Sequence, residues 1–174
     1  MKISANAIKE LRDITCSSIT HCKKALEDAK GDIKQAAILL RKQGLEIAAR
    51  KQARSAKEGR VDAYIHHGNK IGVLLEVNCE SDFVARNEEF TRFTKELAMQ
   101  IAATSPAYIK KEDVPPELLQ HEKRKEDYYI NNCLLEQVFV KDPGMTIKDY
   151  LGSVVAKIGE NIVIRRFTRY KIGE

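Results

Sequence analysis

The sequence predicts an α+β protein with a small helical module at its N-terminus, and three observations lead to this class. Apolar residues recur at helical spacing through the first 44 residues. Between residues 61 and 78 the pattern changes to alternation on both sides of a Gly68-Asn69 pair. Beyond residue 87, helical patterns lead to a final stretch rich in β-branched residues. Helices and strands in separate blocks of this kind are typical of α+β domains.

Residues 1–44 are expected to fold as a bundle of three short helices. Each helix has an apolar face and a residue able to cap its first turn. Gly31 is expected to end the second helix and Gly44 the third. A bundle of this size lies near the lower limit for independent folding. The expected caps are Ser4, Ser17 or Ser18, and Asp32.

Residues 45–59 are expected to form a basic helical linker ending near Gly59, because Ala, Lys, Arg and Gln all favour helix. Residues 60–174 then form the α+β core. A hairpin is expected over residues 61–78, and a C-terminal strand over residues 161–171 joins it, since a two-stranded sheet is marginal by itself. The prediction is a three-stranded antiparallel sheet packed with helices.

Three helices are expected to accompany this sheet. Asn87 can cap the first, which has acidic residues in its opening turn that suit the helix dipole. A Pro115-Pro116 pair can begin the second. Thr146 and Asp149 resemble a capping box before the third. The expected helices span residues 87–104, 115–130 and 147–158.

The formal charge of this 174-residue chain is +5, and it is distributed unevenly. Residues 41–60 carry a net charge of +5, whereas residues 61–160 carry −5. Three interpretations of the basic stretch stay open: a solvated helical linker, a patch contacting phosphates, or a contact with an acidic protein. An RNA- or ribosome-binding module using residues 41–60 is therefore an alternative function.

Catalysis, metal binding and membrane insertion find little support in the sequence. It contains neither a glycine-rich phosphate loop nor a nucleophile elbow, and no apolar run approaches the ~20 residues of a membrane helix. Cys16, His21 and Cys22 lie close together, but their spacing matches no usual zinc motif, and Cys22 reads as a buried thiol. We expect a cytoplasmic protein that is not an enzyme and has no metal, cofactor or small-molecule substrate.

The segment joining the hairpin to the next helix, residues 78–87, is unusual because it places Asp82 beside the large aromatic Phe83. Connectors at such junctions are where rigid scaffolds display binding groups. Two interpretations stay open from the pattern alone. Phe83 is displayed to a partner, or it packs beneath the loop while Asp82 caps a turn.

Three motifs, in order along nearly the whole chain, resemble signatures of the translation elongation factor Ts family. The first is Leu11-Arg12, followed by Cys22-Lys23-Lys24-Ala25-Leu26 and Gly31-Asp32. The second is Glu76-Val77-Asn78-Cys79-Glu80-Ser81-Asp82-Phe83-Val84-Ala85-Arg86-Asn87. The third is Val155-Ala156-Lys157-Ile158-Gly159-Glu160-Asn161-Ile162, followed by Arg165-Arg166. The chain has room for one core half, as in the short form of the family.

The resemblance implies a guanine-nucleotide exchange factor for elongation factor Tu, the GTPase that delivers aminoacyl-tRNA to the ribosome. It also implies that the N-terminal bundle resembles a ubiquitin-associated domain and docks on the GTPase. The family's segment that enters near the Mg²⁺ and phosphate site corresponds here to Ser81, Asp82, Phe83 and Val84. Phe83 would act as an apolar wedge, and Asp82 would act through charge and hydrogen bonding near the magnesium.

The resemblance has consequences for further contacts and for assembly. The segment before the second helix differs from the family's usual Thr-Gly-Ala-Gly-Met-Met, so it offers other apolar side chains to a partner. The short form of the family pairs as a homodimer, and we expect a homodimer here. A general peptide- or ubiquitin-like-binding adaptor is disfavoured by the long core beyond residue 60. The further partner-binding candidates are Arg12, Ile19, Thr20, Arg86 and Asn87.

Overall fold

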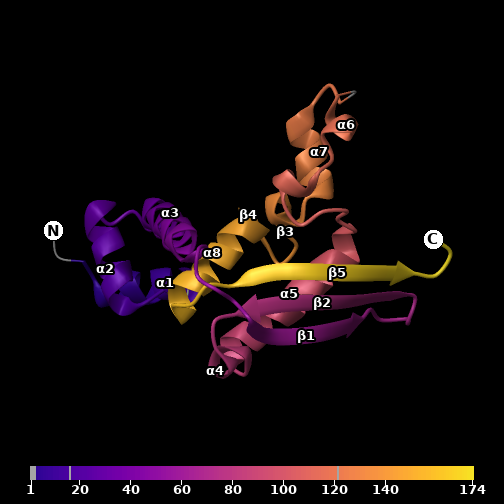
Figure 1. The fold of residues 1–174 in the computed structure, drawn as a ribbon. Coiled ribbons are helices and arrows are strands. Elements are labelled where there is room, and N and C mark those ends of the chain that lie inside the picture. The colour runs from indigo at the N-terminus through magenta and orange to yellow at the C-terminus, as the bar shows by residue number, and fades with distance from the viewer. Residues whose placement is uncertain (1–2, 16, 121) are drawn as a thin grey trace.

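Three helices at the N-terminus pack around a small core of their own (Figure 1). The computed structural model describes residues 3–15, 17–120 and 122–174. The three helices are α1 (Ala5–Thr15), α2 (Ile19–Asp28) and α3 (Ile33–Lys51). The caps Ser4, Ser18 and Asp32 are confirmed, because each side chain accepts a hydrogen bond from a backbone N–H three residues later. The buried residues of the bundle are Leu11, Cys22, Ala25, Leu26, Ala36, Ala37 and Leu40.

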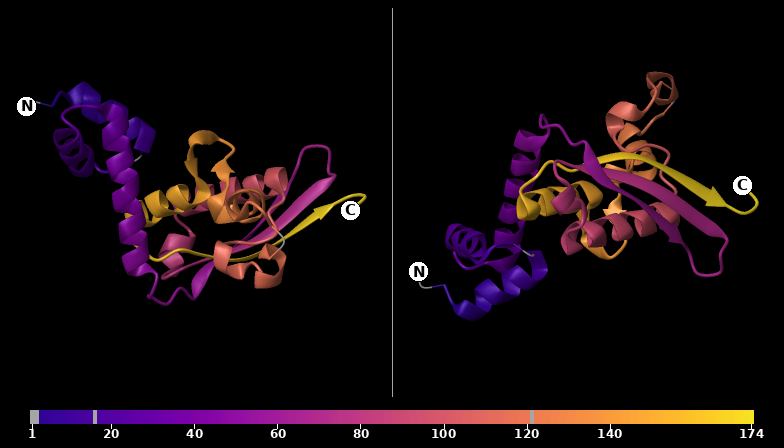
Figure 2. Two further views of the ribbon diagram at one scale, coloured as in Figure 1. Left: turned by 90° about the horizontal axis from the view of Figure 1, so that it is seen from above. Right: turned by 60° about the horizontal axis from the view of Figure 1, so that its bottom comes forward.

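The prediction that Gly44 ends the third helix is wrong, because α3 continues to Lys51. The glycine serves a close approach between helices instead. A Cβ added to Gly44 would lie 3.2 Å from the carbonyl oxygen of Gly152 in α8 (Ile147–Ile158). A Cβ added to Gly152 would in turn lie 3.1 Å from Cδ2 of Leu45. The two glycines therefore let α3 and α8 pack backbone to backbone, which joins the bundle to the core (Figure 2).

The linker expected to be helical over residues 45–59 is helical only as far as Lys51. Residues 52–57 form a turn and an irregular segment, and strand β1 begins at Glu58. The side-chain amide of Asn161 donates to the carbonyl oxygen of Arg54 at 2.8 Å. That carbonyl therefore bonds to a side chain of the core instead of to a further helical turn.

The core contains a three-stranded antiparallel sheet in the order β1 (Glu58–Ile65), β2 (Ile71–Cys79) and β5 (Val163–Lys171). This confirms the predicted α+β class and the predicted three-stranded sheet. Gly68 and Asn69 both have positive φ angles, 88° and 57°, at the hairpin turn. The hairpin predicted around the Gly-Asn pair is confirmed, and residues 66–70 connect its two strands.

One face of this sheet is covered by α5 (Glu88–Thr104), with α8 packed beside it. The side chains of alternate β2 residues point into this layer, which is the period expected of a strand. The predicted caps of both helices are confirmed: Asn87 accepts from the backbone of Glu89, and Thr146 and Asp149 form a capping box. The largest buried side chains of the layer are Phe90, Phe93, Leu75, Leu97, Ile101, Leu134 and Ile147.

The opposite face of the sheet has apolar side chains but no covering element among the described residues. Val61, Ile65, Leu74 and Tyr170 are each more than half exposed. Asp62 lies on the covered face instead, where it accepts hydrogen bonds from Arg60 at 2.8 Å and from Thr94 of α5. The strand β1 thus buries Asp62 while it exposes Val61 and Ile65.

The predicted helix over residues 115–130 is wrong as a single element. Its residues form two short helices, α6 (Pro116–Leu119) and α7 (Lys125–Asn132). Residues 122–127 are all exposed, so no burial supports a continuous helix through them. Both helices project from the core (Figure 1). Two 3₁₀ turns (Lys111–Asp113 and Leu134–Glu136) and a small hairpin of β3 (Val138–Phe139) and β4 (Asp142–Thr146) complete this region.

No helix within the described ranges is long and apolar enough to span a bilayer.

Replacing Gly44 with valine is expected to lower the free energy of unfolding by about 1–3 kcal/mol, the usual cost of overpacking. The new side chain would meet the backbone of α8 near Gly152. Valine has a better helix propensity than glycine by a few tenths of a kcal/mol, so without a clash the variant would be slightly more stable. Urea unfolding followed by circular dichroism measures the difference.

Ala49→Val is the matched control for this variant, since Ala49 is an exposed position of the same helix. It is expected to cost about 0.5 kcal/mol through helix propensity alone. A Gly44→Val protein as stable as the wild type would contradict the role assigned to Gly44.

Candidate partner-binding site

The segment that carries the predicted site folds as a single helical turn, α4 (Asp82–Ala85), between β2 and α5. Ser81 is its N-cap, because its hydroxyl accepts from the backbone N–H of Val84 at 3.4 Å. The N–H of Asn87 donates to the carbonyl of Val84 at 3.0 Å. The turn lies at the end of the sheet away from the β1–β2 hairpin turn (Figure 1).

Phe83 is displayed on the outside of this turn, and 83% of its surface is exposed. Its neighbours Val84 and Ala85 pack against the main core instead. Of the two interpretations that the sequence left open, packing of Phe83 beneath the loop does not occur. Ser81, and not Asp82, caps the turn. The ring of Phe83 therefore faces solvent, while the packing of Val84 and Ala85 on the core holds the backbone that carries it.

The carboxylate of Asp82 pairs with the guanidinium of Arg86 at 2.9 Å, one helical turn farther along the chain. The exposed fractions of the two side chains are 47% and 80%, so solvent screens the pair and it contributes little to stability. Such a weak pair leaves Asp82 able to interact with another group near Phe83.

The backbone before Phe83 is held by Glu160, which lies 79 residues away in sequence from Ser81. One carboxylate oxygen of Glu160 accepts from the backbone N–H groups of Glu80 and Ser81, each at 3.0 Å. The other oxygen accepts from the hydroxyl of Ser81 at 2.6 Å. Sequence reasoning missed this residue as a contact of the site, although it lies within the third family motif.

A second carboxylate makes the reciprocal contact. Glu80 accepts from the backbone N–H of Asn161 at 2.6 Å and lies 3.6 Å from the guanidinium of Arg54. Lys51, at the end of α3, donates to the carbonyl of Gly159 at 2.6 Å. The turn formed by residues 159–161 therefore contacts both the end of α3 and the segment before Phe83.

Cys79 ends β2 directly below this junction and is fully buried. Its thiol donates to the carbonyl oxygen of Ser81 at 3.1 Å. Burial, followed by the negative charge of Glu160, raises the pKa of the Cys79 thiol to about 11. At neutral pH the thiol is therefore protonated and serves as a hydrogen-bond donor to the turn.

The candidate residues of the N-terminal bundle form a separate group. Arg12 is exposed near the end of α1, and Ile19 and Thr20 are exposed at the start of α2. The helices α1 and α2 contact each other and α3, whereas α4 contacts β1, β2 and α5. The structure thus divides the predicted site residues between two surfaces, one on the bundle and one on the core.

Of the three residues considered as zinc ligands, Cys16 lies outside the described residues. Cys22 is fully buried, as predicted, and burial raises the pKa of its thiol. No group of three or more His, Cys, Asp or Glu side chains in residues 3–15, 17–120 and 122–174 could hold a metal ion.

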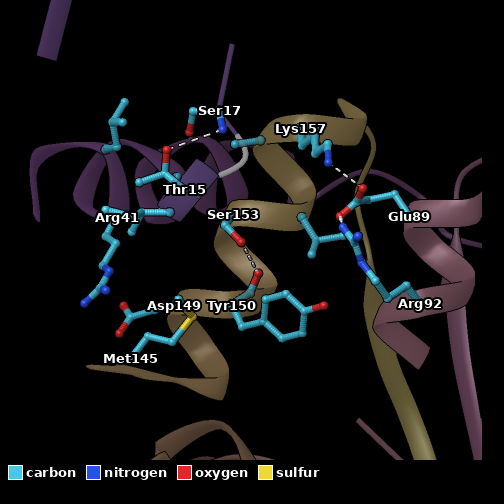
Figure 3. Close-up of a pocket in the computed structure, with 15 residues that line it drawn as sticks. Thr15, Ser17, Arg41, Glu89, Arg92, Met145, Asp149, Tyr150, Ser153 and Lys157 are labelled. Carbon is cyan, nitrogen blue, oxygen red and sulfur yellow. Dashed lines mark hydrogen bonds and ion pairs between the residues drawn. The ribbon is translucent and has the colours of Figure 1, made fainter. Parts of the chain in front are cut away.

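A cavity of about 100 Å³ lies where the bundle meets the core (Figure 3). Thr15 and Arg41 line it from the bundle, and Tyr150, Lys157 and other residues line it from the core. On one side, the carboxylate of Glu89 lies between the cationic groups of Lys157 and Arg92 and is hydrogen-bonded to both (Figure 3). This cavity belongs to the contact between the two parts.

Several cations of the basic stretch 41–60 make contacts within the molecule. Arg41 donates to the carbonyl of Gly144, and Arg60 pairs with Asp62 at 2.8 Å. Lys51 and Arg54 contact the junction described above. These contacts involve four of the seven cations of the stretch, so part of its positive charge already serves contacts within the molecule and is less available to phosphates.

The comparisons with known proteins agree on one family. The family model described as "Elongation factor TS" matches residues 2–127. Elongation factor Ts of Caldanaerobacter subterraneus subsp. tengcongensis is 51% identical over 195 aligned positions, covering 99% of this chain and 98% of that protein. Elongation factor Ts of Geobacter sulfurreducens is 46% identical, covering 100% and 91%. Elongation factor Ts of Methylacidiphilum infernorum is 46% identical, covering 99% and 96%. This chain therefore belongs to the elongation factor Ts family and is a translation elongation factor.

Proposed function

We propose that this protein is a guanine-nucleotide exchange factor that binds elongation factor Tu–GDP in the cytoplasm and promotes GDP release. The observation that carries the proposal is the exposure of Phe83. This aromatic side chain is 83% exposed, and the backbone just before it is hydrogen-bonded to Glu160. Exposing an aromatic side chain to water costs free energy that a partner's apolar pocket recovers. The protein makes and breaks no covalent bond in this role.

Phe83 is the wedge in this proposal. Aromatic side chains that enter a pocket dominate the energy of many protein interfaces. The ring would enter an apolar slot of the GTPase near its magnesium and phosphate site and displace the elements that hold them. Val84 packs on the core and the Ser81 hydroxyl is hydrogen-bonded to Glu160. These contacts would keep the backbone of the turn in place while Phe83 inserts.

Asp82 is the charged group of the same surface. Its carboxylate is half exposed and paired only weakly with Arg86. Beside a magnesium site, this negative charge would compete with the ligands of the metal. Loss of Mg²⁺ removes much of the electrostatic attraction that holds GDP.

The energetics follow from linkage. A factor that binds the nucleotide-free GTPase more tightly than the GDP form must weaken GDP binding by the same factor. The bundle surface at Arg12, Ile19 and Thr20 would supply affinity for the GTPase, while Phe83 and Asp82 would distinguish its two states. The α3–α8 contact joins the two parts of the molecule that carry these surfaces.

Replacing Phe83 with alanine is expected to reduce the stimulation of GDP release about thirtyfold, which corresponds to a hot-spot loss of about 2 kcal/mol. The fold is expected to be unaffected, because the side chain makes little contact with its own core. Stopped-flow release of fluorescent GDP from elongation factor Tu measures the rate, and thermal unfolding checks the fold.

Leu118→Ala is the matched control, since Leu118 is an exposed apolar residue of α6, remote from the turn in sequence. It should retain the exchange activity of the wild type. Release by the wild-type protein at saturating concentration that is no faster than spontaneous release would refute the proposed function. Full activity in Phe83→Ala would refute only the wedge.

We also propose that the chain forms a homodimer through the uncovered face of its sheet. Val61, Ile65, Leu74 and Tyr170 lie there, each more than half exposed, and the ion pair of Glu76 with Arg166 lies on the same face. A sheet with one bare apolar face gains stability when a second sheet packs on it. A second copy of the chain offers the same surface, as a two-fold symmetric contact requires.

Replacing Leu74 with glutamate is expected to convert the dimer to a monomer at micromolar concentration, because the charge would be buried at the centre of the interface. Size-exclusion chromatography with light scattering measures the mass. Leu118→Glu introduces the same charge on α6 and should leave the dimer intact. A wild-type protein that elutes as a monomer would remove this proposal.

A further inference from the structure

The turn that presents Phe83 has few strong contacts of its own. It consists of four helical residues, and its cap bond from Val84 to the Ser81 hydroxyl is long, at 3.4 Å. One isolated turn is unstable without outside support, since it fixes several backbone angles for very few hydrogen bonds. The position of Phe83 therefore depends on groups outside α4.

Val84 and Ala85 pack on the core, and Glu160 supplies the charged contacts from outside the turn. It accepts three hydrogen bonds from the two residues before Asp82: two from backbone N–H groups at 3.0 Å and one from the Ser81 hydroxyl at 2.6 Å. Hydrogen bonds to an ionised carboxylate are shorter and about twice as strong as neutral ones. The same hydroxyl accepts from Val84, so Glu160 also orients the cap of the turn.

Glu160 is itself held in place by the residues on both sides of it. Gly159 adopts the left-handed conformation, with φ of 85°, and ends α8. Its carbonyl accepts from Lys51 of α3, while the backbone of Asn161 donates to Glu80. Hydrogen bonds therefore hold the residues on both sides of Glu160, and one of these bonds comes from α3, the helix that leads to the N-terminal bundle.

We propose that Glu160 is a positioning residue for nucleotide exchange, which holds the Ser81–Val84 turn so that Phe83 and Asp82 are presented in the geometry needed to act on the GTPase. Glu160 acts through Ser81 and does not itself touch the nucleotide. This inference rests on the proposed exchange function. It predicts that loss of the carboxylate affects the step of GDP release more than the step of docking, because the bundle surface is unchanged.

Glu160→Gln and Glu160→Ala are the test variants. An amide keeps one acceptor oxygen, whereas alanine keeps none, so the loss should be larger for alanine. The maximal rate of GDP release at saturating factor is expected to fall about tenfold in Glu160→Gln, because the weakened hydrogen bonds leave Phe83 in its working position only part of the time. The factor concentration at half-saturation should change less than about threefold, since most of the docking surface is intact. Glu117→Gln, at an exposed position of α6, makes the same chemical change and should change neither value.

This comparison separates positioning from a general loss of stability. A partly unfolded variant has fewer active molecules, which raises the half-saturating concentration and leaves the maximal rate unchanged. Circular dichroism and thermal unfolding report the folded fraction directly. If Glu160→Ala does not fold, Ser81→Ala removes the hydroxyl bond to Glu160 together with the cap bond from Val84, but it keeps the two backbone bonds to Glu160. This variant is expected to show a smaller fall of the maximal rate.

The thiol of Cys79 gives a readout that does not involve the GTPase. It lies buried beneath the carbonyl of Ser81, so an alkylating reagent reaches it only when the turn opens. Iodoacetamide labelling of the native protein, located by peptide mass spectrometry, is expected to be about tenfold faster at Cys79 in Glu160→Gln. Because the charge of Glu160 itself raises the pKa of this thiol, labelling is also measured in Ser81→Ala, which keeps that charge and is expected to accelerate labelling by a smaller factor. Cys22 and Cys133 are also buried and act as internal controls whose labelling should not change.

The outcomes distinguish this inference from the function on which it rests. A wild-type protein without exchange activity refutes the proposed function, and the labelling of Cys79 then still decides whether Glu160 holds the turn. Exchange by the wild type, combined with an unchanged maximal rate in Glu160→Gln, overturns the positioning role alone. Unchanged labelling of Cys79 overturns the claim that Glu160 holds the turn.

Discussion

The hydrogen bonds between residues 80–81 and residues 160–161 are the interaction on which the arrangement of the site depends. Glu160 accepts from the backbone of Glu80 and Ser81, and Glu80 accepts from the backbone of Asn161. Each carboxylate satisfies donors that would otherwise be left without partners at the ends of a strand and a helix. The two segments are therefore fixed to each other by charge-assisted bonds, and the one-turn helix carrying Phe83 begins directly after them.

This junction also connects the site to the N-terminal bundle. Lys51 and the carbonyl of Arg54 contact the same turn of the core. Earlier in α3, Gly44 lies against Gly152 of α8. These two glycines let the backbones of α3 and α8 come into contact. Close packing at these two glycines resists sliding of the helices at that point, and the cavity of about 100 Å³ lies beside it. The bundle and the Phe83 turn thus belong to one connected scaffold.

The contacts of the basic residues 41–60 change how the positive charge of this stretch is interpreted. The basic stretch 41–60 would suggest a nucleic-acid surface, yet Arg41, Lys51, Arg54 and Arg60 contact carbonyl or carboxylate groups of the core. The apolar side chains of the three-stranded sheet are likewise divided between contacts within the chain and an exposed surface. The sheet buries one face under α5 and leaves Val61, Ile65 and Leu74 exposed on the other, where a second sheet can pack.

Elements whose signals are local could be predicted from residue types alone. The caps at Ser18, Asp32 and Asn87 and the Gly68-Asn69 turn follow from short-range hydrogen bonds and backbone angles, so residue types a few positions apart suffice to predict them. The motif around Phe83 was identified by its resemblance to the family's motif, because the local pattern left open whether the ring is exposed. The folded structure was needed to show that Gly44 allows a helix contact instead of ending a helix, that β1 buries Asp62, and that Glu160 holds Ser81. Each of these depends on groups that are distant in the chain and meet only when it folds, and no local pattern records which distant group a side chain will meet.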